Sequence, residues 1–123
     1  MSKSMWMIAL VLLQVGNAIA QNCDTARGQR NFATKCALCH VAEPGAASTV
    51  GPNLHGVVGR AVAVMDFSYS DALQKAGGFW DEQRLEKFLT SPQTMVPGTA
   101  MPFQGMKSAS ERQTLICYLN TLK

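Results

Sequence analysis

The sequence predicts a small all-α domain with long irregular connections between its helices. Three observations indicate this class. Helix-capping residues precede stretches in which apolar side chains recur at helical spacing, Gly- and Pro-rich stretches separate those segments, and no convincing alternating strand pattern is present. A chain of 123 residues is the size of one domain, and so short a chain buries a limited core of its own.

The first helix is predicted to begin after Asp24 and to run to about Cys36. The Asp24 carboxylate can accept a hydrogen bond from the exposed backbone amides of the first turn. Gly28 and Phe32 are four residues apart, so they share one face of this helix.

Two shorter helices are predicted in the middle of the chain. Residues 70–76 can form one, which the pair Gly77-Gly78 would end. Asp81 can cap the other, and Pro92 lies just beyond its end. The apolar stripe of this second helix consists of Leu85, Phe88 and Leu89.

The last helix is predicted to follow a capping box formed by Ser108 and Glu111. Its apolar face carries Leu115, Tyr118, Leu119 and Leu122. Between the predicted helices, residues 41–60 and 91–107 are rich in glycine, proline and small residues, and we expect them to be irregular.

Residues 1–20 are predicted to be a cleavable signal peptide, which leaves residues 21–123 as the mature domain. Lys3 gives a positively charged start, residues 5–15 are mostly apolar, and Ala18-Ile19-Ala20 is a small-x-small cleavage site. The alternative is an uncleaved membrane anchor, but the apolar run is shorter than the ~20 residues that span a bilayer. We therefore expect export to the periplasm and cleavage after Ala20.

The charge of the chain excludes one class of function. The formal net charge is +3, and removal of Lys3 with the signal peptide lowers it by one unit. A domain of such low charge is not basic enough to bind nucleic acid by overall electrostatic attraction.

The pentapeptide Cys36-Ala37-Leu38-Cys39-His40 carries the chemistry of the sequence. A Cys-x-x-Cys-His run is typical of covalent c-type haem attachment, because two thiols reach the two vinyl groups of one porphyrin edge and the adjacent imidazole reaches the iron. The alternatives are a zinc site and a redox dithiol. A zinc site needs two more ligands at matching spacing, and a dithiol of the thioredoxin kind needs a βαβ pattern, neither of which is present. A haem protein would use the irregular stretch of residues 41–60 to wrap one side of the ring.

The second axial position of the iron decides between electron transfer and the binding of gases or peroxide. The methionines of the mature chain are the candidates for this position: Met65, Met95, Met101 and Met106. Met101 is favoured because Pro97 and Pro102 stiffen its loop and Gly98 permits a tight turn. The other three are interpreted as flexible core fillers. A thioether ligand raises the reduction potential.

The mature chain resembles class I cytochrome c, specifically the mitochondrial-type branch and its bacterial relatives. The resemblance covers nearly the whole chain from Gly28 onward. The matching residues are Gly28, Phe32, the pentapeptide 36–40, Gly51-Pro52-Asn53-Leu54-His55-Gly56, Gly59-Arg60, Phe67-Ser68-Tyr69-Ser70-Asp71-Ala72, Trp80, Pro97-Gly98-Thr99-Ala100-Met101, Phe103, Leu115 and Tyr118. It implies a small cytochrome c fold in which the terminal helices cross at Gly28, Phe32, Leu115 and Tyr118.

The resemblance also implies roles around one covalently attached haem c. Cys36 and Cys39 would form the thioethers, and His40 and Met101 would be the axial ligands of the iron. The carbonyl of Pro52 would accept a hydrogen bond from His40. The remaining implied roles are propionate binding by Arg60, Tyr69 and Trp80, a hydrogen bond near the haem from Thr99, and a cover over the ring from Phe103. His55 is interpreted as a loop residue and not a ligand.

Two groups of residues depart from the family pattern. Leu73 and Phe88 stand where the family often has asparagine and tyrosine, so we expect a less hydrogen-bonded pocket on the methionine side. Arg30, Lys35 and Lys107 match charges around the haem edge of mitochondrial members. Gln93, Thr94 and Ala100 replace several other lysines there, so we expect weaker electrostatic docking.

The sequence does not decide whether Cys23 and Cys117 form a disulfide. They lie near the two terminal helices, and an oxidising compartment permits a disulfide, but two separate thiols fit equally well.

The function predicted is that of a soluble, monomeric one-electron carrier without enzymatic activity. Its partners would be a membrane oxidase or reductase complex, or a periplasmic dehydrogenase. A peroxidase-like enzyme or gas-binding module with an open distal site is the alternative, which Met101 in its proline-rich loop disfavours. Permanent association with a dehydrogenase is a third possibility. The sequence does not identify the donor, the acceptor, the pathway or the midpoint potential.

Overall fold

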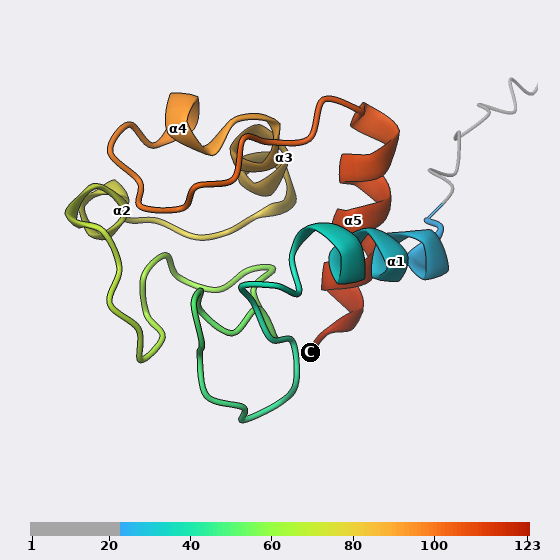
Figure 1. The fold of residues 1–123 in the computed structure, drawn as a ribbon, viewed down its shortest axis with the longest axis horizontal. Helices are drawn as coiled ribbons and strands as arrows, with labels where there is room; N and C mark the ends of the chain where they lie inside the picture. Colours follow the sequence, from blue (N-terminus) through green and yellow to red (C-terminus); the bar gives the residue numbers. More distant parts are fainter. Residues whose placement is uncertain (1–22) are drawn as a thin grey trace, which may run out of the picture.

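The computed structural model describes residues 23–123, which form five helices joined by long irregular segments (Figure 1). The helices are α1 (Thr25–Lys35), α2 (Asp71–Ala76), α3 (Glu82–Thr90), α4 (Pro92–Met95) and α5 (Ala109–Thr121). The only β-pairing in this part of the chain is an isolated bridge between Ala61 and Phe79. The predicted all-α fold is confirmed, whereas the predicted signal peptide lies outside the described residues.

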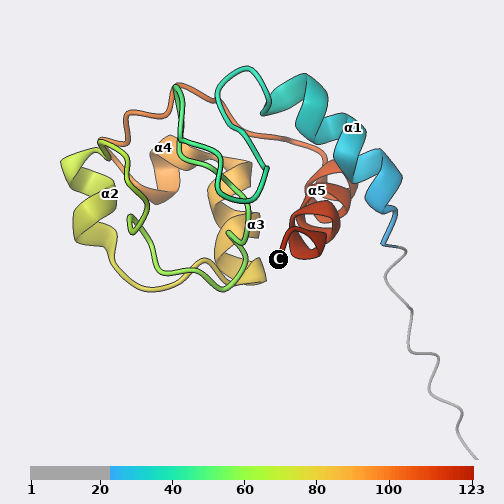
Figure 2. The ribbon, with the colours of Figure 1, turned by 90° about the horizontal axis from the view of Figure 1, so that it is seen from below.

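The two terminal helices, α1 and α5, cross at one end of the molecule (Figures 1 and 2). Gly28 makes this crossing possible, because a Cβ atom at that position would lie 1.9 Å from the carbonyl oxygen of Thr114. Asn31 donates a hydrogen bond to Thr114 Oγ1 at 3.2 Å, and the rings of Phe32 and Tyr118 lie 5.6 Å apart. Leu115 is the most deeply buried apolar side chain of the core. The predicted crossing is therefore confirmed.

A disulfide joins Cys23, just before α1, to Cys117 in α5, with a Cα–Cα distance of 5.5 Å. The sequence left this pairing open, and the crossing of the helices decides it. The bond closes a loop that spans 94 positions, so in a chain-entropy description it restricts most of the unfolded chain.

Three predicted capping residues, Asp24, Asp81 and Ser108, begin helices as expected, and Ser70, for which no capping role was predicted, begins α2 in the same way. Their side-chain oxygens accept hydrogen bonds from backbone amides three residues later: Asp24 from Arg27, Ser70 from Leu73, Asp81 from Arg84, and Ser108 from Glu111. The short helix α4 was not predicted, because residues 91–107 were expected to be irregular throughout. Ser91 caps it and Pro92 occupies its first turn, where a missing backbone amide costs nothing.

Helix α3 supplies much of the core that faces the middle of the molecule. Its predicted stripe of Leu85, Phe88 and Leu89 is buried. The Phe88 ring lies 4.9 Å from that of Trp80. These residues form one cluster with the buried side of α5 and with Met106, which is 2 % exposed.

Residues 41–60 form an irregular loop, and the buried side chain of Asn53 holds it together through hydrogen bonds. This side chain is 2 % exposed, donates to the carbonyls of Glu43 and Ala46, and accepts from the amide of His55. A buried amide satisfied in this way holds a helix-free loop in one conformation. None of the helices within residues 23–123 has the length and apolar character needed to cross a bilayer.

Candidate cofactor site

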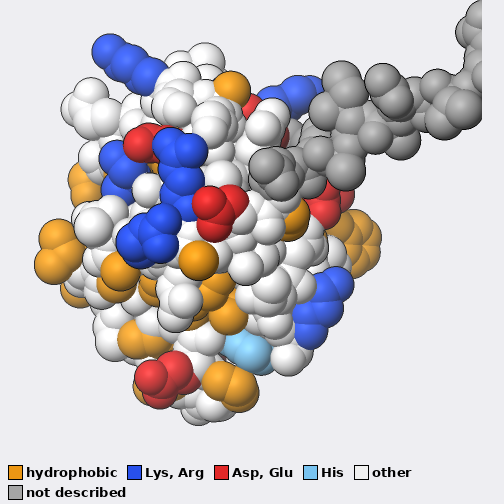
Figure 3. Space-filling model, turned by 90° about the vertical axis from the view of Figure 1, so that its right-hand side faces the viewer, with side chains coloured by type: hydrophobic (Ala, Val, Ile, Leu, Met, Phe, Trp, Pro, Cys, Tyr) orange, Lys and Arg blue, Asp and Glu red, His pale blue; other side chains and the backbone are white. Residues whose placement is uncertain are grey.

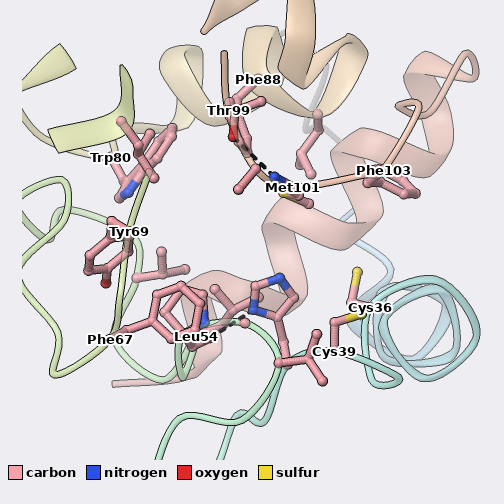
Figure 4. Close-up of a pocket in the computed structure, with 18 of the residues that line it drawn as sticks. Cys36, Cys39, Leu54, Phe67, Tyr69, Trp80, Phe88, Thr99, Met101 and Phe103 are labelled. Atoms are coloured by element: carbon pink, nitrogen blue, oxygen red, sulfur yellow. Dashed lines mark hydrogen bonds between the residues drawn. The ribbon is translucent and has the colours of Figure 1, made fainter. Parts of the chain in front are cut away.

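A cavity of about 530 Å³ lies between the irregular segments, with α3 and α5 behind it. Figure 4 shows side chains from both loop regions and from the helices converging on it. Most of the lining is apolar, and the volume lies in the range of about 300–1,000 Å³ that small-molecule and cofactor sites occupy. Every residue predicted for the haem site lines this cavity: Cys36, Cys39, His40, Pro52, Arg60, Tyr69, Trp80, Thr99, Met101 and Phe103.

The predicted attachment cysteines lie in a tight turn at the end of α1. Cys36 ends the helix, and the amides of Cys39 and His40 both donate to its carbonyl, at 3.0 and 2.9 Å. Cys36 and Cys39 are free thiols on the cavity wall. Burial raises the pKa of the Cys36 thiol to about 11, which opposes the thiolate and favours an uncharged sulfur in this position.

His40 follows Cys39 in the sequence, and a hydrogen bond holds its imidazole ring in one orientation. Its Nδ1 atom donates to the carbonyl of Pro52 at 2.7 Å, which fixes the tautomer and leaves Nε2 for a ligand. Burial lowers the pKa of the imidazole, and the Pro52 hydrogen bond opposes this shift. Gly51 provides the space, because a Cβ atom there would lie 2.5 Å from the ring.

Met101 lies across the cavity from Leu54 and Cys39, on the loop that follows α4 (Figure 4). Of the four methionines within residues 23–123, Met101 alone lines the cavity. Its backbone is held on both sides, since its amide donates to Thr99 Oγ1 at 3.4 Å and its carbonyl accepts from Gln93 Nε2 at 2.6 Å. Met106 is buried in the core and Met95 packs against it, as predicted for core fillers, whereas half-buried Met65 lies outside this cluster, so that interpretation is wrong for Met65.

Arg60, Tyr69 and Trp80 line the cavity together, and Figure 4 shows Tyr69 and Trp80 on the side away from Cys36 and Cys39. The Arg60 guanidinium donates to the carbonyls of Asn53 and His55, and burial lowers its pKa. Neither of the two ion pairs found within residues 23–123 includes Arg60, so this half-buried cation has no carboxylate partner there.

The orientation of Tyr69 leaves a hydrogen-bond donor for a ligand. The Tyr69 hydroxyl accepts from the amide of Met65 at 3.2 Å, so its own hydrogen is not used in that contact. The backbone amide of Trp80 donates to the Arg60 carbonyl at 2.8 Å, which ties these two segments together. An anionic group is the natural partner for this end of the cavity.

The remaining predicted positions complete the wall. Phe103 lies on the same side as Cys36 in Figure 4 and is half-buried. Leu73 and Phe88 also line the cavity, so the two departures from the family pattern leave apolar side chains there. His55 is outside the lining, and its Nδ1 atom lies 3.2 Å from the Ala42 carbonyl, which agrees with its interpretation as a loop residue.

Sequence reasoning missed three residues that support the site. Asn53 and Gly51 belong to the motif that carried the resemblance, but no role was predicted for them. Gln93 was considered only as the replacement of a surface lysine, yet its amide holds the Met101 carbonyl. A buried amide and a glycine of ordinary φ give little sequence signal, because only the fold shows what they contact.

The residues present fit a covalently bound haem. Two adjacent sulfurs and an imidazole line one apolar cavity, and a cation without a carboxylate partner lines it together with a hydroxyl whose hydrogen is free. A thioether is uncharged and apolar, which suits the buried position of Cys36. The fold and this site together define a small c-type haem protein.

Comparisons with known proteins agree with this class. The family profile described as cytochrome c matches residues 25–123. Cytochrome c of Chlamydomonas reinhardtii is 45% identical over 97 residues, which cover 78% of this chain and 87% of that protein. Cytochrome c2 of Rhodoblastus acidophilus is 42% identical over 101 residues, which cover 81% of this chain and 94% of that protein.

Among solved structures, cytochrome cH from Methylobacterium extorquens superposes with a TM-score of 0.74 and 39% identity, covering 80% of this chain and 98% of that one. The chain belongs to the cytochrome c family, as a class I member. Its cofactor is accordingly a covalently bound haem c, and its general function is that of a haem electron carrier.

Proposed function

We propose that this chain is a one-electron carrier whose haem iron is ligated by His40 and Met101. The bound haem takes up or gives one electron at its iron, and the protein supplies ligation, orientation and an apolar environment. The observation that carries the proposal is that His40 and Met101 line the same cavity, with Met101 the single methionine to do so among the described residues.

The other predicted residues hold the haem in place. Cys36 and Cys39 form the thioether bonds, and Pro52 orients His40 through the 2.7 Å hydrogen bond to Nδ1. Arg60, Tyr69 and Trp80 bind the haem propionates. This assignment is supported by the Arg60 guanidinium, which has no carboxylate partner within residues 23–123. Thr99 positions the Met101 backbone, and Phe103 covers the edge of the ring near Cys36.

Ligation from both sides favours electron transfer over chemistry at the iron. A ring held by two covalent bonds and two axial ligands changes geometry little between oxidation states. If His40 and Met101 both hold the iron, no position would remain for a gas or peroxide, and the chain would act as a carrier rather than an enzyme.

The experiment replaces Met101 with alanine in the matured holoprotein. The far-red sulfur-to-iron absorption band should disappear, the midpoint potential should fall because a thioether raises it, and the ferrous protein should bind carbon monoxide rapidly. Met65→Ala is the matched control, because Met65 is half-buried but does not line the cavity. Rapid carbon monoxide binding by the unmodified ferrous protein would instead favour the gas-binding or peroxidase-like alternative.

We further propose that the chain is exported to the periplasm as a monomer and exchanges electrons there with a membrane complex or a dehydrogenase. The support is the signal-peptide pattern of residues 1–20 and the disulfide, which requires an oxidising compartment. Mass spectrometry of the purified protein should give an N-terminus at Gln21. Gel filtration of a native extract distinguishes a free carrier from a permanent dehydrogenase subunit.

A further inference from the structure

The Trp80 side chain contacts two side chains of helix α3, one aromatic and one cationic. The ring centroids of Trp80 and Phe88 lie 4.9 Å apart, and the guanidinium carbon of Arg84 lies 5.4 Å from the Trp80 ring centroid. Trp80 is 7% exposed, its amide donates to the Arg60 carbonyl, and its carbonyl accepts from the Gly59 amide. Because the backbone is fixed in this way, the contacts with α3 decide how the indole lies.

Gly78, two residues before Trp80, leaves space for the Arg84 guanidinium. A Cβ atom at this glycine would overlap with Arg84 Nη1. The Gly78 carbonyl accepts from the Val62 amide at 2.8 Å, which fixes this turn against the neighbouring segment. Arg84 is half-buried, so its guanidinium packs against the turn and the indole instead of extending into solvent.

The Arg84 guanidinium has no carboxylate partner within residues 23–123, because neither of the two ion pairs there includes it. The Asp81 carboxylate is close in sequence, but it accepts from the Arg84 backbone amide, at 2.7 Å. On the α1–α5 face of the molecule, by contrast, acidic side chains lie beside basic ones (Figure 3). A cation that contacts an aromatic face without a carboxylate beside it keeps its charge available to other groups.

Arg84 lies behind the wall of the cavity. Trp80 and Arg60 line the cavity, whereas Arg84 does not. Figure 4 shows Trp80 on the side of the cavity away from Cys36 and Cys39. That side therefore has two cations without carboxylate partners in the described part of the chain, Arg60 in the wall and Arg84 behind the indole.

We infer that Arg84 is a positioning residue for the cofactor: its guanidinium fixes the Trp80 indole in the cavity wall and raises the midpoint potential of the haem. This inference rests on the proposed function, which places the haem propionates on the side of Arg60 and Trp80. A fixed positive charge disfavours the ferric state, which carries one more positive charge than the ferrous state. Because a buried ring lies beside the guanidinium, its field is screened less than that of a fully exposed cation.

The test replaces Arg84 in the matured holoprotein and measures the midpoint potential by mediated redox titration. Arg84→Met keeps an aliphatic side chain but loses the charge. At a fixed ambient potential, its ratio of ferric to ferrous protein should rise about threefold. Arg84→Lys keeps the charge and should restore most of the original ratio. An unchanged potential in Arg84→Met, or an equal fall in Arg84→Lys, would overturn the inference.

Lys87→Met is the matched control, because it removes one positive charge from an exposed position of the same helix. Lys87 neither lines the cavity nor forms one of the ion pairs of the described residues. Its substitution should leave the ratio of ferric to ferrous protein nearly unchanged. The same rise in Lys87→Met and Arg84→Met would assign the effect to net charge and overturn the inference.

Near-ultraviolet circular dichroism tests the positioning of the indole separately, because Trp80 is the only tryptophan within residues 23–123. The tryptophan bands should weaken in Arg84→Met and persist in Lys87→Met. Arg84→Gln is a second uncharged variant whose polar end suits a half-buried position, and it should show the same two changes as Arg84→Met. Native tryptophan bands in both uncharged variants would overturn the positioning role.

Titration of the unmodified holoprotein keeps this test apart from that of the proposed function. A missing one-electron couple at the haem contradicts the carrier function itself. A reversible couple whose midpoint potential does not respond to the Arg84 substitutions contradicts only the role of Arg84.

Discussion

The crossing of α1 and α5 and the wall of the cavity are built in different ways. At the crossing, contacts within the chain suffice: two backbones touch at Gly28, rings and a hydrogen bond join the helices, and a disulfide closes the pair. The cavity wall consists mostly of irregular segments around about 530 Å³ that the chain does not fill with its own side chains. The first region is thus held by the protein alone, whereas the second depends on its cofactor.

The largest effect is expected from Gly28→Val at the crossing. The new Cβ atom would lie 1.9 Å from the carbonyl oxygen of Thr114, so the helices must separate. We expect a loss of at least about 4 kcal/mol in the free energy of unfolding, measured by denaturant titration of the holoprotein. As the control, Gly45→Val should cost only roughly 1–2 kcal/mol, because Gly45 has φ +72° but open space around it. Similar losses in both variants would mean that the crossing is not tightly packed.

Removal of the disulfide should have the next largest effect. Replacing Cys23 and Cys117 together by serine releases a constraint over 94 positions and should lower the free energy of unfolding by about 2–4 kcal/mol. The midpoint potential should stay the same, because neither cysteine lines the cavity. A changed potential with unchanged stability would contradict the separation of the two regions.

A smaller effect is expected from Gly51→Ala behind the imidazole. Its Cβ would lie 2.5 Å from the His40 ring, so the ring must shift from the Pro52 carbonyl, at a cost of about 1–3 kcal/mol. The optical spectrum and the midpoint potential should change more than the stability of the terminal helices. Retention of the native spectrum would show that the loop itself moves to make room.

The smallest effect is expected from Phe88→Tyr in the apolar wall. One added hydroxyl makes the environment more polar, which favours the more highly charged oxidised iron and should lower the midpoint potential by tens of millivolts. Phe79→Tyr, at an exposed position outside the cavity lining, should leave the potential unchanged. An unaltered midpoint potential in Phe88→Tyr would contradict the idea that the apolar lining at this position affects the potential of the haem iron.

The difference between the helix crossing and the cavity wall also explains how much of the structure could be predicted from the sequence. Helices α1, α3 and α5 follow from capping residues and apolar spacing, and α2 from the Gly77-Gly78 pair that ends it; all of these are local signals. Helix α4 was missed because Pro92 was interpreted as the residue beyond a helix, although it equally suits the first turn of a new one. The Cys23–Cys117 pairing depends on a distance between helices, which no local pattern contains.

For the site, the pentapeptide 36–40 and the proline-flanked Met101 carried enough chemistry to predict the cofactor and candidate ligands, whereas the residues predicted around it came from the resemblance to the family. The support from Asn53, Gly51 and Gln93 was not predictable in the same way. Each acts on a backbone or ring that lies elsewhere in the chain, so its contact exists only after the loops have closed. The exposure of Leu38, which is 88%, was not predictable either, because Leu38 occupies a variable position of the Cys-x-x-Cys-His motif.

The disulfide also constrains the order in which the protein matures. Cys23 lies near the start of the domain and Cys117 near its end, so the bond can form only after almost the whole chain has been synthesised. Until then the chain carries four thiols, and premature oxidation between Cys36 and Cys39 would remove the two thiols to which we propose that the haem attaches. The proposed assembly therefore requires that Cys36 and Cys39 stay reduced until the haem is attached, and that Cys23 and Cys117 are oxidised only with each other.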